Sequence, residues 1–158
     1  TINIETKTTT DNIEKIIAIN NVYKDTDKVN GWVFGRVDYA LSAGLKRNDI
    51  NNSEEITNAV INVAKSAKKN NLNLVVGGGV SIDSLDILKR VKEVHLDRFE
   101  TRKVIFSSEA LDIKNLDKGM LKAINFELLW LRNKKNYYGS IFNEDDKRIK
   151  MLSDRWNV

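Results

Sequence analysis

Short apolar runs alternate with longer amphipathic stretches over the first two thirds of the chain, and this alternation limits the choice of fold more than any other feature. Residues 2–4, 31–34 and 72–76 are apolar runs of strand length. Between the last two runs, apolar residues recur three and four positions apart from residue 56 to residue 67, which is typical of an amphipathic helix. Repeated strand–helix units predict an α/β fold with a parallel sheet and right-handed crossovers.

Capping residues indicate where the helices begin. Asp11 is expected to cap a first helix, and Asn52 with Glu55 resembles the capping box of the helix that covers residues 56–67. The segment 77–79 is Gly-Gly-Gly, and a further helix is predicted after it, from about residue 81 to residue 94. A fourth strand is predicted from about residue 99 to residue 106.

The last third of the chain has a different pattern. Residues 116–138 are predicted to form a long helix with two apolar stripes, and residues 143–156 a shorter helix. A helix on the outside of one sheet needs only one apolar stripe. The second stripe therefore predicts a homo-oligomer, assembled through the long helix. On this basis residues 1–110 are assigned to four strand–helix units and residues 111–158 to a helical extension.

Composition excludes several classes of protein. The chain has no cysteine, which excludes disulfides and thiolate metal sites and agrees with the cytoplasmic location that we expect. No apolar run approaches the roughly 20 residues that cross a bilayer, so no membrane partner is expected. The formal net charge is +4, but the lysines are scattered among acidic residues, which predicts no nucleic-acid partner.

Two acidic residues follow the first two predicted strands. Glu5 comes directly after residues 2–4, and Asp38 comes shortly after residues 31–34. Because the carboxyl ends of parallel strands meet at one rim of the sheet, the two carboxylates are expected to lie close together and to bind a divalent cation. The alternative is that one of them is a helix cap or a surface acid.

Glycines accompany both strand ends. Gly35 permits a tight turn, after which the amides of Val37 and Asp38 would face an anion; alternatively, Gly35 only serves the turn and Arg36 is solvated. The glycines at 77–79 precede a helix and either line a substrate site or form only a tight turn.

Other ionisable residues are given structural roles. His95, the only histidine, follows a predicted helix at the rim opposite the strand ends, so a surface or packing role is expected. Glu100 and Arg102 are expected to form an ion pair with a structural role.

Two motifs at this separation carry a family resemblance. They are the tripeptide IET, which contains Glu5, and the segment GWVFGRVD, which ends at Asp38 and is followed by Leu41 and Gly44. Together they resemble the HpcH/HpaI aldolase and citrate lyase family. The similarity continues through NSEEI at residues 52–56 to about residue 79, and more loosely over residues 100–104.

The resemblance implies the C-terminal half of a (β/α)8 barrel of the TIM type, with a long C-terminal helix exchanged between subunits. It implies that Glu5 and Asp38 are the metal ligands, with Mg²⁺ or Mn²⁺ as the cofactor. The implied activity is a metal-dependent carbon–carbon lyase or aldolase that acts on a pyruvate-like 2-oxo acid or an acyl thioester such as an acyl-CoA. The residues expected to bind substrate are Gly35, Arg36, Val37, Asp38, Gly77 and Gly78.

The family barrels have four further strand–helix units before the IET strand, and these supply an arginine and the acid/base residues. The 158 residues contain none of these units, so catalytic residues are not assigned, and the isolated chain is expected to turn over poorly or not at all. Two other interpretations stay open. One is a non-catalytic assembly module, based on the two-striped helix. The other is a half-barrel that binds a phosphate ligand at residues 77–81.

Overall fold

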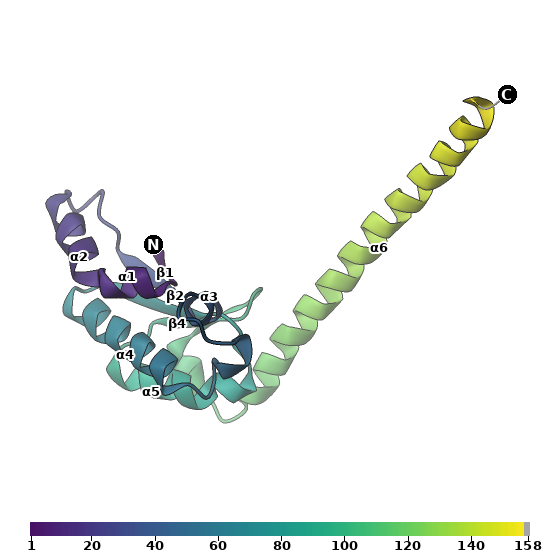
Figure 1. Ribbon diagram of the computed structural model, residues 1–158. Helices are drawn as coiled ribbons and strands as arrows, with labels where there is room; N and C mark the ends of the chain where they lie inside the picture. The colour runs from purple at the N-terminus through teal and green to yellow at the C-terminus, as the bar shows by residue number, and fades with distance from the viewer. Residues whose placement is uncertain (157–158) are drawn as a thin grey trace. The chain divides into compact units, whose positions relative to one another are not determined.

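The computed structural model describes residues 1–156 of the chain. It divides the chain into two compact units (Figure 1). Unit 1 is Thr1–Ala123, and unit 2 begins at Ile124. The division falls inside the last helix, α6 (Leu116–Trp156), so that the first turns of α6 belong to unit 1.

Unit 1 is built on a five-stranded sheet. Its strands are β1 (Ile2–Ile4), β2 (Gly31–Gly35), β3 (Asn73–Gly77), β4 (Arg98–Glu100) and β5 (Ile105–Ser107). They lie side by side in the order β1-β2-β3-β4-β5. The first four are parallel to one another, and β5 is antiparallel to β4. The predicted α/β class, with a mostly parallel sheet and a long C-terminal helix, is confirmed.

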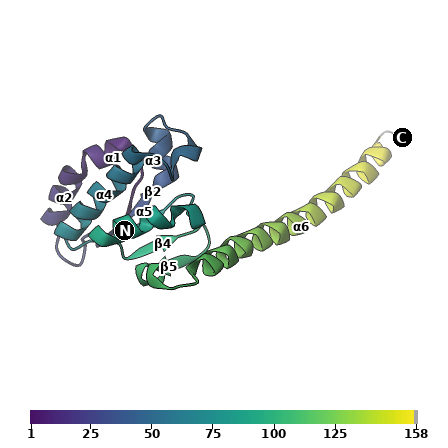
Figure 2. The same cartoon turned by 90° about the horizontal axis from the view of Figure 1, so that it is seen from below.

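Helices connect the parallel strands, as the sequence pattern requires. Figure 2 shows the helical layer above the strands β4 and β5. Besides α6, the α-helices are α1 (Lys7–Asp11), α2 (Ile13–Val22), α3 (Arg36–Ser42), α4 (Glu54–Lys69) and α5 (Leu85–Val94). Three short 3₁₀ helices complete the unit: η1 (Arg47–Asp49), η2 (Ile82–Ser84) and η3 (Ser108–Asp112).

The two faces of the sheet differ in the size of their side chains. Because side chains alternate along a strand, one face carries large apolar residues, all of them at most 1% exposed: Ile4, Trp32, Phe34, Leu74, Val76 and Phe99. These pack with the apolar side of α4 and α5 into a single core. The other face carries small and polar residues: Asn3, Gly31, Val33, Gly35, Asn73, Val75, Gly77, Arg98 and Glu100. The candidate site lies at the carboxyl-terminal end of this second face.

The prediction of a single fourth strand over residues 99–106 is wrong. Residues 99–106 form two strands, β4 and β5, joined by a turn. Within that turn the Thr101 amide donates to the Val104 carbonyl at 2.9 Å, and the Val104 amide donates to Thr101 Oγ1 at 3.2 Å. The hydroxyl and backbone of Thr101 thus close the turn, and the chain reverses. Phe99 and Phe106 then stack, with ring centroids 5.0 Å apart.

Three expected helix boundaries are also corrected. Asp11 is the last residue of α1 and caps no helix start; Thr6 caps α1 by accepting a hydrogen bond from the Thr9 amide at 3.1 Å. The cap of α4 is Ser53, whose hydroxyl accepts from the Ile56 amide. In the C-terminal third, the two expected helices are one continuous helix, α6, which runs through residues 139–142.

The cap of α4 gives a direct test of this boundary. Replacement of Ser53 by alanine removes the hydroxyl that accepts from the Ile56 amide, so we expect the free energy of unfolding to fall by about 1 kcal/mol in urea denaturation. Asn52→Ala is the matched control, because Asn52 is exposed and precedes the cap. It should change stability by less than about 0.5 kcal/mol. Equal losses in both variants would contradict the assignment.

Candidate functional site

The candidate site lies at the carboxyl ends of the four parallel strands. Glu5 follows β1, Gly35 ends β2, Gly77 ends β3 and Glu100 ends β4. The register places these ends at one level, because Ile4 pairs with Phe34, Gly35 with Gly77, and Val76 with Phe99. Two acids and two glycines therefore form a row across the rim of the sheet.

Glu5 and Asp38 converge above Gly35. A methyl group built on Gly35 would sit 2.8 Å from Glu5 Oε2 and 3.4 Å from Asp38 Oδ2. The two oxygens are therefore no farther apart than the sum of these distances, a range that includes the roughly 3–4 Å between neighbouring oxygens on one octahedral cation. The two side chains point to the same place, and the absence of a side chain at Gly35 leaves that place open.

The local structure positions both acids. The Asn3 side-chain amide donates to Glu5 Oε1 at 3.3 Å, which holds one oxygen of that carboxylate. Asp38 lies in the first turn of α3, which begins immediately after β2 with Gly35 at its cap position. Because α3 starts where β2 ends, its first turn places Asp38, three residues after Gly35, at the rim.

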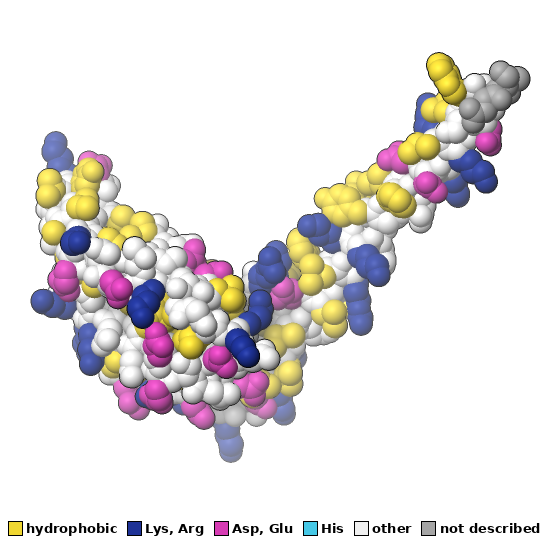
Figure 3. Space-filling view, viewed as in Figure 1, with side chains coloured by type: hydrophobic (Ala, Val, Ile, Leu, Met, Phe, Trp, Pro, Cys, Tyr) yellow, Lys and Arg dark blue, Asp and Glu magenta, His cyan; other side chains and the backbone are white. Residues whose placement is uncertain are grey.

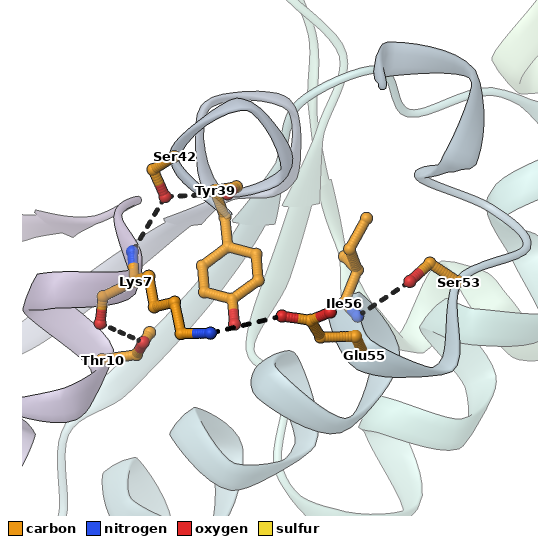
Figure 4. A network of polar contacts seen from close by, with 7 residues as sticks. All are labelled: Lys7, Thr10, Tyr39, Ser42, Ser53, Glu55 and Ile56. Carbon is orange, nitrogen blue, oxygen red and sulfur yellow. Dashed lines mark hydrogen bonds and ion pairs between the residues drawn. The ribbon is translucent and has the colours of Figure 1, made fainter. Parts of the chain in front are cut away.

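A network of polar contacts fixes the segment after Glu5 to α3 (Figure 4). The Lys7 amide donates to Ser42 Oγ at 2.8 Å, and Ser42 Oγ donates to the Tyr39 carbonyl at 2.8 Å. Lys7 Nζ lies 3.7 Å from Glu55 Oε1 on α4. Burial, followed by the charge of Glu55, raises the pKa of the Tyr39 phenol, which therefore stays neutral at pH 7. The network joins the segment that follows Glu5 to α3, which carries Asp38, and to α4.

Glu100 is a third acid at this rim, and the sequence pattern gave it only a structural role. A methyl group on Gly77 would sit 3.0 Å from Glu100 Oε1, so the Glu100 side chain leans over Gly77 as Glu5 leans over Gly35. The strand predicted over residues 99–106 placed Glu100 near its start, whereas β4 ends at Glu100 because the chain turns at Thr101. Among residues 1–156, no three Asp, Glu, His or Cys side chains form a ready metal cluster. The rim thus provides a pair of convergent carboxylates, with Glu100 farther along the row.

Arg36 is buried, and the alternative of a solvated side chain is wrong. It is 0% exposed, and its guanidinium donates to Asn51 Oδ1 at 3.0 Å and to Ser84 Oγ at 2.9 Å. These partners are neutral, and Nε has none among the described atoms. Burial lowers the pKa of Arg36 to about 10, so it remains a cation at pH 7. Its bonds join α3 to the loops before α4 and α5.

The loop after β3 packs against the start of α3. Gly78 has a φ of 81°, and a methyl group there would sit 2.7 Å from the backbone nitrogens of both Arg36 and Val37. The Ser81 amide donates to Ser84 Oγ at 3.1 Å and is thus already bonded within the loop. Gly77 therefore lies beside Gly35, and Gly78 beside Arg36 and Val37, all of them among the residues predicted to bind substrate. Gly78 is required for close packing of this loop against α3.

His95 lies at the other end of the sheet, as expected. Its Nε2 is 2.9 Å from the Leu72 carbonyl, just before β3 begins, and 3.3 Å from Asp97 Oδ2. Asp97 in turn accepts from the Leu74 amide at 2.7 Å. These contacts fix the amino-terminal end of β3 and leave His95 remote from the row of acids.

Comparison of the chain with protein-family models, curated proteins and solved structures finds no significant match. The geometry of the rim and the sequence motifs therefore carry the functional argument. Over residues 1–156, none of the helices combines the length and the apolar character that a membrane span requires.

Gly78 and Gly44 form a matched pair for testing the loop packing. Both have positive φ, 81° and 75°, but a methyl group on Gly44 would meet nothing within 4 Å. We expect Gly44→Ala to lower the free energy of unfolding by about 1–2 kcal/mol, from backbone strain alone. Gly78→Ala should lower it by about 3 kcal/mol or more, since the methyl group also collides with two backbone nitrogens. Chemical denaturation measures both, and equal losses would contradict the packing.

Proposed function

We propose that the chain is the C-terminal half of a (β/α)8 barrel whose parent activity is a divalent-metal-dependent carbon–carbon lyase or aldolase. Glu5 and Asp38 hold Mg²⁺ or Mn²⁺, and the substrate is a 2-oxo acid or an acyl thioester. The observation that carries the proposal is the convergence of Glu5 Oε2 and Asp38 Oδ2 above Gly35. The resemblance of the IET and GWVFGRVD motifs to the HpcH/HpaI aldolase and citrate lyase family supports the class of substrate.

The topology of the sheet supports a barrel fragment. Four parallel strands follow one another in sequence order, as in a barrel, whereas a doubly wound sheet reverses its order at a switch point. The face with small and polar residues would line the barrel interior. The antiparallel β5 departs from this pattern, because it occupies the edge of β4 on which a barrel would place its first strand. Closure would therefore require β4 to exchange β5 for a parallel strand.

The donor set at the rim suits a hard cation. Mg²⁺ in proteins is commonly held by one or two carboxylates, and water and substrate oxygens complete its coordination. When bound, such a cation polarises the carbonyl of a 2-oxo acid. The chain's own residues would hold the cation through Glu5 and Asp38. The Val37 and Asp38 amides would orient the substrate carboxylate, and Gly35 and Gly77 would leave room for it. No acid or base is assigned.

Titration of the purified chain with Mn²⁺ by calorimetry tests the metal site. We expect one Mn²⁺ per chain, and at least about tenfold weaker binding in Glu5→Gln and in Asp38→Asn, since each variant removes one of two anionic ligands. Glu109→Gln is the matched control. It removes an exposed carboxylate from η3, which follows Ser107 at the opposite end of the sheet. The absence of Mn²⁺ binding, or equal binding in all variants, would overturn the proposal.

Gly35→Ala tests whether the two carboxylates share the cation. Gly35 has a φ of −90°, which alanine adopts without backbone strain. The added methyl group would sit 2.8 Å from Glu5 Oε2 and 3.1 Å from Glu5 Cβ, so the Glu5 side chain must move away from Asp38, with some loss of stability. We expect weaker Mn²⁺ binding in a variant that still unfolds cooperatively in urea. Undiminished Mn²⁺ binding would show that the two carboxylates do not share the cation.

A further inference from the structure

A regular seam of exposed side chains runs along α6 from Ile124 to Trp156. Its ten positions are spaced alternately by four and three residues, the heptad spacing of a coiled coil. Eight of the ten are apolar, and their exposed fractions range from 40% at Ile124 to 88% at Trp156. Figure 3 shows yellow hydrophobic side chains along the whole helix. The seam consists of Ile124, Leu128, Leu131, Lys135, Tyr138, Phe142, Asp145, Ile149, Leu152 and Trp156.

We propose that a second copy of this chain covers the seam, and that the two α6 helices pair as an antiparallel coiled coil. The spacing of the seam reads the same in both directions and is centred at residue 140. Two antiparallel copies therefore meet in register, residue by residue, about a two-fold axis. The resulting layers are Ile124 with Trp156, Leu128 with Leu152, Leu131 with Ile149, Lys135 with Asp145, and Tyr138 with Phe142, each layer occurring twice.

The two charged seam residues specify the direction of pairing. Lys135 and Asp145 interrupt an otherwise apolar stripe, and they lie at equal distances on either side of residue 140. In the antiparallel pair each Lys135 meets Asp145 of the second copy, so both charges are compensated. A parallel, in-register pair would instead place lysine on lysine and aspartate on aspartate. Buried like charges are strongly unfavourable, so the parallel arrangement is selected against.

The same two residues also fix the register. If one helix slides by a heptad in either direction, Lys135 faces Leu152 or Tyr138 of the second copy, and Asp145 faces Phe142 or Leu128. Each charge would then be buried against an apolar side chain without a counter-ion. A polar pair at an otherwise apolar seam is a known means of fixing coiled-coil register, at some loss of stability.

Charges beside the seam favour the pairing on balance. The positions that flank the seam are e and g of each heptad, and in antiparallel coiled coils e lies opposite e, and g opposite g, of the other helix. This places Glu127 opposite Arg155, and Arg132 opposite Asp146, both of which are attractive pairs. The third pair is repulsive: Lys134 lies opposite Arg148. The Lys134 ammonium lies 5.3 Å from the Trp130 ring centroid and 5.7 Å from that of Tyr138 on its own helix, and these cation–π contacts stabilise it there.

Charge reversal in the full chain tests this pairing. We expect Lys135→Asp and Asp145→Lys, each alone, to weaken dimerisation at least about 100-fold in sedimentation equilibrium, because each variant places like charges in two layers. The double variant Lys135→Asp/Asp145→Lys has the same composition as the original chain and should restore the dimer. In a parallel dimer, the single variants would not weaken dimerisation and the double variant would have nothing to restore. That result would overturn the proposal.

Cysteine cross-linking reports the direction independently. The chain contains no cysteine, so introduced thiols give an unambiguous product. The pair Leu128→Cys/Leu152→Cys should form a cross-linked dimer on oxidation, since these positions face each other in the antiparallel pair. Leu128→Cys alone should remain largely uncross-linked; efficient dimers of this single variant would indicate a parallel arrangement. A chain that stays monomeric at tens of micromolar in sedimentation equilibrium would also overturn the proposal. The inference does not depend on the proposed metal site.

Discussion

The rim of the sheet depends on close approach of backbone and carboxylates at three glycines. Gly35 and Gly77 leave space above the strand ends, into which Glu5 and Glu100 lean, and Gly78 brings the loop after β3 against the first amides of α3. A single added methyl group at any of these positions would meet a neighbour within about 3 Å. The position of the acids and the packing of the loops are therefore set by the same constraint, which is the lack of a side chain at the strand ends.

Arg36 shows how this rim is held from within. A buried cation that donates only to neutral oxygens is unfavourable by itself, yet its planar guanidinium reaches Asn51 and Ser84 at once. A lysine in its place would offer no such fork. The loops that precede α4 and α5 are thus anchored to α3, the helix that carries Asp38. Together with the bond from the Lys7 amide to Ser42 on the other side of α3, this makes α3 the common support of the rim.

Apolar periodicity was sufficient to predict the strands β1, β2 and β3 and the helices α4 and α5. It was also sufficient to place Glu5 and Asp38 at neighbouring strand ends, since parallel strands bring those ends together. It did not predict the turn at Thr101. That turn depends on the hydrogen bond from the Val104 amide to the Thr101 hydroxyl, and without it the residues on both sides are read as one strand. Burial of Arg36 was equally hidden, because its partners are 15 and 48 residues away in the chain. The sequence pattern also predicted two helices, over residues 116–138 and 143–156, where α6 is one continuous helix.

Glycine is among the weakest helix formers, and Gly139 removes about 1 kcal/mol of helix stability relative to alanine. Helices in water gain most of their stability from packing an apolar face. If the seam of α6 is covered only when two chains meet, then ordering of the helix beyond Gly139 and association of the chains become one cooperative event. Helix content in this segment would then rise with protein concentration, and dilution would leave a frayed end accessible to proteases.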